Sequence, residues 1–127
     1  MITRQVVSPS AGFAEAVTAT APGRTVYLAG NVGFDSNGAI VPGGIEAEAR
    51  QTFANLERTL ARAGGSFDHI VKILAFLVDV EDYPGYAKVR AELFADRLPA
   101  SSTVVVKGFV VDARIEIEAV AFIPDAA

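Results

Sequence analysis

The C-terminal part of the chain limits the fold more than any other segment. Its last apolar run alternates, and one face carries only aliphatic residues: Ile115, Ile117, Ala119 and Ala121. This period of two predicts a half-buried strand over Arg114–Phe122, preceded by a strand over Ser102–Lys107. Glu118 shares the other face with Val120 and Phe122. A carboxylate in that position either keeps an edge strand soluble or is positioned in a cleft.

Two segments have the period of an amphipathic helix. In Glu46–Ala63 apolar residues recur every three or four positions, and Gly64-Gly65 follows where glycine commonly ends a helix. Asp82–Leu98 is the second predicted helix, with Asp82 as its N-cap, Tyr86 in its buried stripe and Pro99 as its stop. Charged residues of the first helix are expected to face solvent: Arg50, Glu57, Arg58 and Arg62.

The remaining apolar runs predict strands. Ile70–Asp79 is almost continuously apolar, which is typical of a central strand covered on both faces. Shorter strands are predicted over Ile2–Val7 and Thr25–Gly30, and Phe13–Ala21 has a weaker alternation. This order predicts an α+β fold, a sheet with two helices packed on one face, in a single domain over 1–127. A partner subunit could cover the other apolar face of the central strand.

Composition excludes several classes of function. The net charge of −4 argues against nucleic acid as a partner. With no Cys and one His, the sequence favours neither a metal site nor a cofactor, and His69 is expected to be a loop or capping histidine. No apolar run is long enough for a membrane span and the N-terminus does not resemble a signal peptide, so the expected compartment is the cytoplasm.

A resemblance to a known family appears in the same C-terminal segment. PASSTVVV and RIEIEAVAFI resemble the closing signature of the Rid (YjgF-like) family, which comprises small trimeric enamine and imine deaminases. GRTVYLAGNV, EARQTFANLERTLARAG and IVKILAFLVDVEDYPGY also match, so the resemblance covers roughly residues 23–123. It implies a chorismate-mutase-like fold, a homotrimer, and a small-molecule pocket between subunits.

The resemblance also implies the site. Glu118 matches the family's catalytic-side Glu, which helps to deliver water to a C=N carbon, and Gly30 matches the Gly of a Ser-Gly step. Ser101 stands where the deaminases have an Arg that holds the substrate carboxylate. The expected substrate-binding residues are Phe13 (at a pocket Tyr), Ala29, Gly30, Asn31, Ala87 (at a pocket Asn), Arg90, Ser101, Ser102 and Thr103.

The missing Arg leaves the function open. A Ser cannot replace a bidentate cation, and Arg90, Lys107 or Arg114 could supply one from elsewhere. The favoured hypothesis is a diverged enzyme that hydrolyses an imine, an enamine or a related small metabolite without a metal. The alternative is a trimeric small-molecule binding protein of the same fold without turnover. The ribonuclease activity sometimes attached to the family ranks last, because of the negative charge and the absence of a His pair.

Overall fold

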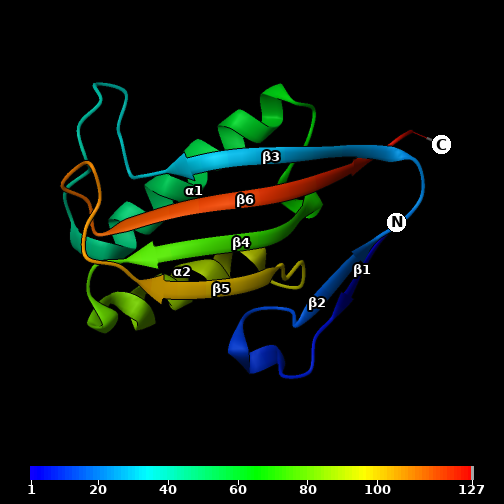
Figure 1. The fold of residues 1–127 in the computed structure, drawn as a ribbon, viewed down its shortest axis with the longest axis horizontal. Helices are drawn as coiled ribbons and strands as arrows, with labels where there is room; N and C mark the ends of the chain where they lie inside the picture. The colour runs from blue at the N-terminus through cyan, green and yellow to red at the C-terminus, as the bar shows by residue number, and fades with distance from the viewer. Residues whose placement is uncertain (127) are drawn as a thin grey trace.

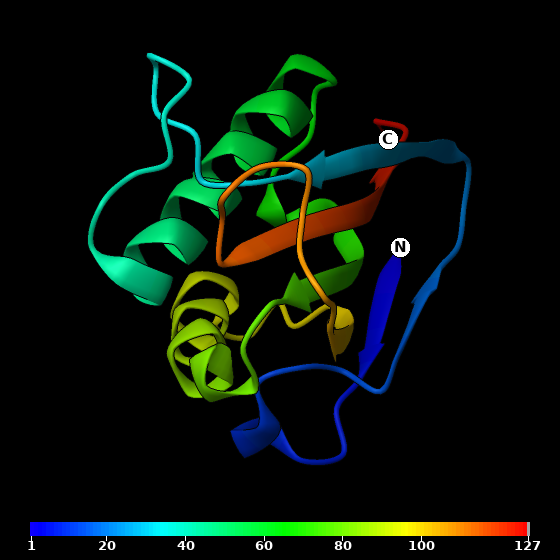
Figure 2. The ribbon, with the colours of Figure 1, turned by 60° about the vertical axis from the view of Figure 1, so that its left-hand side comes forward.

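A computed structural model describes residues 1–126. Four strands form the main sheet, in the order β3 (Gly23–Asn31), β6 (Ile115–Pro124), β4 (Ile70–Leu77) and β5 (Ala100–Val105). β6 is antiparallel to both of its neighbours, whereas β5 is parallel to β4. Helices α1 (Gly44–Arg62) and α2 (Tyr83–Phe94) cover one face of this sheet (Figures 1 and 2). The predicted α+β fold is confirmed, and it is the chorismate-mutase-like fold.

The N-terminal strands form a separate small sheet. β1 (Ile2–Gln5) pairs antiparallel with β2 (Ala16–Ala19), and this pair lies beside the main sheet (Figure 1). Both strands are shorter than predicted. The guanidinium of Arg4 joins β1 to the start of β4 and to the segments before β4 and β5. It donates hydrogen bonds to the carbonyl oxygens of Ile70, Asp68 and Leu98.

The core lies between the sheet and the helices. The four aliphatic residues of β6 that the alternation singled out are buried, as are Ile73, Ala75 and Leu77 of β4. Phe53 of α1 is fully buried among three aromatic rings, with centroid distances of 6.3 Å to Phe67, 6.3 Å to Tyr86 and 5.5 Å to Phe94. The four charged residues of α1 predicted to face solvent are exposed.

The other face of the sheet has no helix over it within residues 1–126 (Figure 1). It carries partly buried apolar residues of the two central strands, namely Leu74, Phe76, Val120 and Phe122. The apolar run of β4 therefore predicted a central strand correctly, but the described chain covers it fully on one face only. That a partner subunit covers the other face stays a prediction.

Helix α2 departs from its predicted ends. It stops at Phe94, four residues early, because Ala95 takes a left-handed backbone conformation with φ of 51°. Asp82 occupies the N-cap position but makes no side-chain cap hydrogen bond there. Its carboxylate instead pairs with Arg114 at 3.2 Å, across the start of β6. At α1 the prediction is confirmed, since Gly64-Gly65 follows the helix and donates to its last carbonyls.

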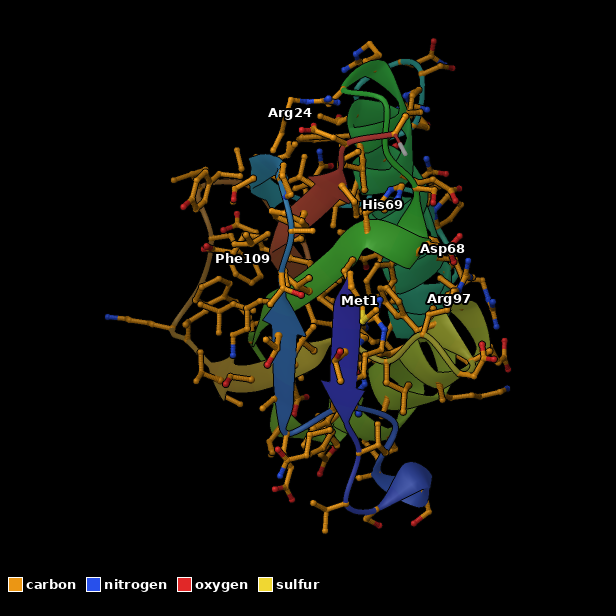
Figure 3. The ribbon with its side chains drawn as sticks, turned by 90° about the vertical axis from the view of Figure 1, so that its right-hand side faces the viewer. Met1, Arg24, Asp68, His69, Arg97 and Phe109 are labelled. Atoms are coloured by element: carbon orange, nitrogen blue, oxygen red, sulfur yellow. The ribbon has the colours of Figure 1, made fainter. Side chains whose placement is uncertain are left out.

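His69 has a local structural role, as predicted. Its Nδ1 accepts a hydrogen bond from the backbone N–H of Ser66 at 3.0 Å and completes a capping box on the short helix Phe67–His69. Figure 3 shows His69 beside Asp68 and Arg97. Arg97 donates to Asp68 at 2.9 Å, and this hydrogen bond holds the pKa of Asp68 below its usual value.

Candidate functional site

A cavity of about 200 Å³ lies at the C-terminal end of β3. Its lining comes from that strand end, from β6 and from the loop between β5 and β6: Gly30, Asn31, Val32, Phe34, Val110, Val111 and Glu116. The loop also borders a more open hollow of about 460 Å³. This loop lies on the side of the sheet away from the helices, where Figure 3 labels Phe109.

Glu116 is the ionisable group of this cavity. Its carboxylate stands so close to Gly30 that a Cβ at that position would lie 2.9 Å from Oε2. The small residue at position 30 therefore makes room for the carboxylate. A β-bulge between Leu28 and Asn31 interrupts the pairing of β3 with β6 at the same place. Bulges of this kind redirect side chains next to functional sites.

A buried amide holds the wall of the cavity. Asn55 of α1 donates from Nδ2 to Asn31 Oδ1 at 3.2 Å, to the carbonyl oxygen of Val32 at 3.1 Å and to that of Phe34 at 3.0 Å. The Asn55 side chain thus links the segment 31–34, at the end of β3 and just after it, to helix α1. Because Asn55 is buried, these carbonyls have little access to water as a replacement partner.

Replacing Asn55 by Leu is expected to lower the free energy of unfolding by about 1–3 kcal/mol, because it leaves buried acceptors unpaired. Urea unfolding followed by circular dichroism measures this. Arg58→Leu is the matched control, since Arg58 is exposed on the same helix and donates only to the Asn55 side chain. Equal stability of wild type and Asn55→Leu would contradict the role assigned to this amide.

The alternation of β6 places two carboxylates on one face, and the structure distinguishes them. Glu116 pairs with Phe76 and lines the cavity, whereas Glu118 pairs with Leu74, is exposed and is not part of the lining. β6 is a central strand, so Glu118 is not an edge-strand residue. The resemblance pointed to Glu118, and sequence reasoning missed Glu116. The signal available in the sequence was that Glu116 lies on the same face of the strand as Glu118.

A second cluster forms on the opposite face, between β5 and α2. Ser101 and Thr103 pair with Ile73 and Ala75, whose side chains are buried beneath the helices. The Tyr86 hydroxyl lies near them: its burial raises its pKa, and the nearby Arg90, Ser101 and Thr103 oppose the rise.

Other residues of the predicted set divide between this cluster and the rest of the fold. Phe13 joins the cluster, with its ring centroid 5.4 Å from Cζ of Arg90. Ala87 is half-buried on α2, one turn before Arg90. Ser102 does not join, because it points to the helix-free face, where its Oγ accepts a hydrogen bond from Lys72. Ala29 is exposed in the bulge of β3.

One chain does not bring the two groups together. Gly30 lies on the edge strand β3 and Ser101 on the opposite edge strand β5. Three inter-strand spacings separate these edges, which is about 14 Å at the usual spacing. The Glu116 carboxylate also lies on the helix-free face, whereas Ser101 faces the helices. Within one chain the two groups therefore do not line the same site.

Replacing Tyr86 by Phe is expected to leave stability at pH 7 unchanged or to raise it by up to about 1 kcal/mol, because the buried hydroxyl has no hydrogen-bond partner. Burial raises the pKa of Tyr86, so the folded state favours the neutral hydroxyl over the phenolate. The stability that this gives is fully present below about pH 10, the pKa of an unfolded tyrosine, and is lost as pH rises through the folded pKa. Urea unfolding between pH 8 and pH 11 should therefore show a smaller alkaline loss for Tyr86→Phe. A lower stability of the variant at pH 7 would contradict the unpaired hydroxyl.

Comparison with known proteins identifies the family. The sequence model described as Endoribonuclease L-PSP matches residues 3–123. The chain belongs to this family, the Rid/YjgF family. A relative from Rattus norvegicus, named 2-iminobutanoate/2-iminopropanoate deaminase, is 36% identical over 94% of this chain and 90% of its own length. A human relative of the same name is 36% identical over 77% of this chain and 72% of its own.

Solved structures of the Rid/YjgF family have the same fold. Yeast Mmf1 superposes with a TM-score of 0.76 at 28% identity, covering 98% of this chain and 100% of that one. RidA from the Antarctic bacterium Psychrobacter sp. gives a TM-score of 0.75 at 29% identity, covering 87% and 88%. Within residues 1–126 this Rid chain shows no helix suited to crossing a membrane and no group of three or more His, Cys, Asp and Glu that could hold a metal ion.

Proposed function

We propose that this protein hydrolyses an imine or enamine of a small metabolite, releasing ammonia and a carbonyl compound. The observation that carries the proposal is the Glu116 carboxylate, held against Gly30 and beside Asn31 in a cavity of about 200 Å³. The deaminase names of the rat and human relatives support the same class of reaction.

The reaction needs few protein groups. Water adds to the C=N carbon while a carboxylate removes its proton, which is the role proposed for Glu116. The nitrogen takes up a proton, the C–N bond of the resulting carbinolamine breaks, and ammonia leaves as the C=O bond forms. Backbone groups of Gly30 and Asn31 would orient the water. An enamine enters the same path after protonation at carbon gives the imine.

The substrate would bind between two copies of the chain. The Glu116 cavity of one copy would supply the reacting groups, and the cluster of Phe13, Ser101 and Thr103 in its neighbour would hold the rest of the substrate. The separation of the two groups within one chain and the helix-free apolar face both support this arrangement. A homotrimer is the assembly that the family resemblance implies, and Glu118 would then lie close to the shared interface.

A binding protein without turnover is the second candidate. The observation in its favour is Ser101, which stands where the resemblance implies the carboxylate-binding Arg. A protein that keeps the pocket but lacks a substrate anchor could bind a ligand without converting it. The two candidates differ in whether any imine disappears faster in the presence of the protein.

An imine hydrolysis assay tests the proposal. An amino-acid oxidase generates 2-imino acids in situ, an amine oxidase generates a neutral imine, and trapping with semicarbazide follows each imine over time. Acceleration of either class over the protein-free rate supports the proposal. No acceleration of any imine, with an Arg-bearing relative active in parallel, would overturn it and favour the binding protein. The Ser101→Arg variant shows whether the added cation alone changes the outcome.

A further inference from the structure

Arg90 is a buried cation without a counter-ion. Its side chain is 1% exposed, and among the described residues no carboxylate lies within 4.0 Å of its guanidinium. Nη2 donates to the carbonyl oxygen of Ala11 at 3.0 Å and to the Tyr83 hydroxyl at 3.3 Å. The buried Nε has no partner. A buried charge that is neither paired nor fully hydrogen-bonded is costly.

Aromatic rings offset part of this cost and fix the guanidinium in place. Its Cζ lies 5.4 Å from the ring centroid of Phe13, 5.7 Å from that of Tyr83 and 5.2 Å from that of Tyr86. Cation–π contacts of this kind stabilise an arginine but accept none of its hydrogen bonds. The buried Nε–H donor therefore stays without an acceptor.

The other unpaired buried polar atoms belong to the same cluster. Within residues 1–126 three buried side-chain atoms lack a hydrogen-bond partner, and they are Arg90 Nε, Tyr86 OH and Ser101 Oγ. The Tyr86 hydroxyl lies near both of the others. Native structures leave few such atoms unpaired, and each one calls for an explanation. All three atoms can donate, so together they suit an acceptor such as an oxyanion.

We propose that Arg90, with the hydroxyls of Ser101 and Tyr86, binds the carboxylate of the substrate in this protein. The cation that binds the carboxylate would thus come from helix α2, and not from position 101 at the start of β5, where the resemblance implies an Arg. Phe13, Ser101 and Thr103 are half-buried, so the cluster borders the surface and a small ligand could reach it beside them. This inference rests on the proposed function, because it gives the imine substrate a carboxylate.

Binding of a reaction product tests Arg90 without turnover. The probe is 2-oxobutanoate, which carries the carboxylate, and butanone is its neutral counterpart; calorimetry and ligand-detected NMR measure both. Arg90→Met is expected to weaken 2-oxobutanoate binding about tenfold or more, because hydrogen bonds to charged groups are lost. Binding of butanone should not change. Arg90→Lys should restore part of the affinity, and Arg50→Met, which removes an exposed cation of α1, should leave it intact.

A second variant keeps the test decisive if Arg90→Met fails to fold. Ser101→Asp would place a carboxylate near the Tyr86 hydroxyl, which Arg90 also approaches, and would so supply the missing counter-ion. It is expected to raise the melting temperature and to abolish the stabilisation that 2-oxobutanoate gives the wild type. A lower melting temperature with unchanged 2-oxobutanoate binding would overturn the inference.

The two proposals fail in different ways. Undiminished affinity of a folded Arg90→Met variant, or no binding of 2-oxobutanoate by the wild type at millimolar concentration, would overturn the role of Arg90. Hydrolysis of neutral imines would still support the proposed function. If the wild type hydrolyses no imine but binds 2-oxobutanoate in an Arg90-dependent way, the enzymatic function is overturned and the anion site at Arg90 stands.

Discussion

Replacing Glu116 by Gln is expected to slow imine hydrolysis about 100-fold or more, because general-base catalysis contributes at least that factor in typical enzymes. Gln has the shape of Glu but cannot take up the proton of the attacking water. The Glu116 side chain lies against Gly30 and lines the cavity, so the substitution changes the chemistry of the site with little change of volume. The rate of imine disappearance with and without each variant, at equal protein concentration, measures the effect.

Two further variants separate this role from a structural one. Gly30→Ala adds a methyl group 2.9 Å from Glu116 Oε2, so it should displace the carboxylate and lower activity. It should cost little stability, since the displaced atoms are the end of a flexible side chain. Glu118→Gln is the matched control on the same face of β6 and should retain activity. Loss of activity in Glu118→Gln alone would instead support the residue that the family resemblance indicated.

Replacing Phe53 by Ala is expected to lower the free energy of unfolding by about 3–5 kcal/mol. The ring is fully buried and contacts the rings of Phe67, Tyr86 and Phe94, so its removal leaves a cavity that these neighbours cannot close. Domains of this size are stable by only about 5–15 kcal/mol, so the loss is a large part of the total.

Urea unfolding of Phe53→Ala beside Phe109→Ala tests the packing of this core. Phe109 is a half-buried aromatic residue of the loop between β5 and β6, and its truncation should cost much less. A loss below about 1 kcal/mol for Phe53→Ala would be outside the range for a fully buried phenylalanine and would contradict the packing described.

The fold was largely predictable because its strongest signals are periodic. The alternation of β6 and the apolar stripe of α1 depend on which residues face the core, and the structure buries those residues. The early end of α2 was not predictable, because Ala95 adopts a left-handed conformation that alanine rarely takes. Asp82 was a reasonable N-cap by type, yet its carboxylate pairs with Arg114, which lies 32 residues away in sequence.

The site was predictable only in part, because it depends on contacts across the sheet. A period of two cannot choose between Glu116 and Glu118, since both lie on the same face. The choice depends on the bulge in β3, which places Gly30 beside Glu116. Likewise, the sequence offered Arg90 as one of several cations, but its burial and its unpaired Nε appear only when α2 packs beside Ser101.

Complementation between two variants tests the shared site most directly. Glu116→Gln alters the cavity on β3 and β6, and Ser101→Phe fills the cluster between β5 and α2; each alone is expected to be inactive. If neighbouring copies supply the two halves of a site in a closed ring, random co-assembly of equal amounts restores about a quarter of the sites. Differently tagged, coexpressed chains that are copurified through both tags contain only mixed assemblies. In a ring of three, each mixed assembly has one intact site of three, so this preparation should regain about a third of wild-type imine hydrolysis. A copurified mixture no more active than the separate variants would contradict a site built from two copies.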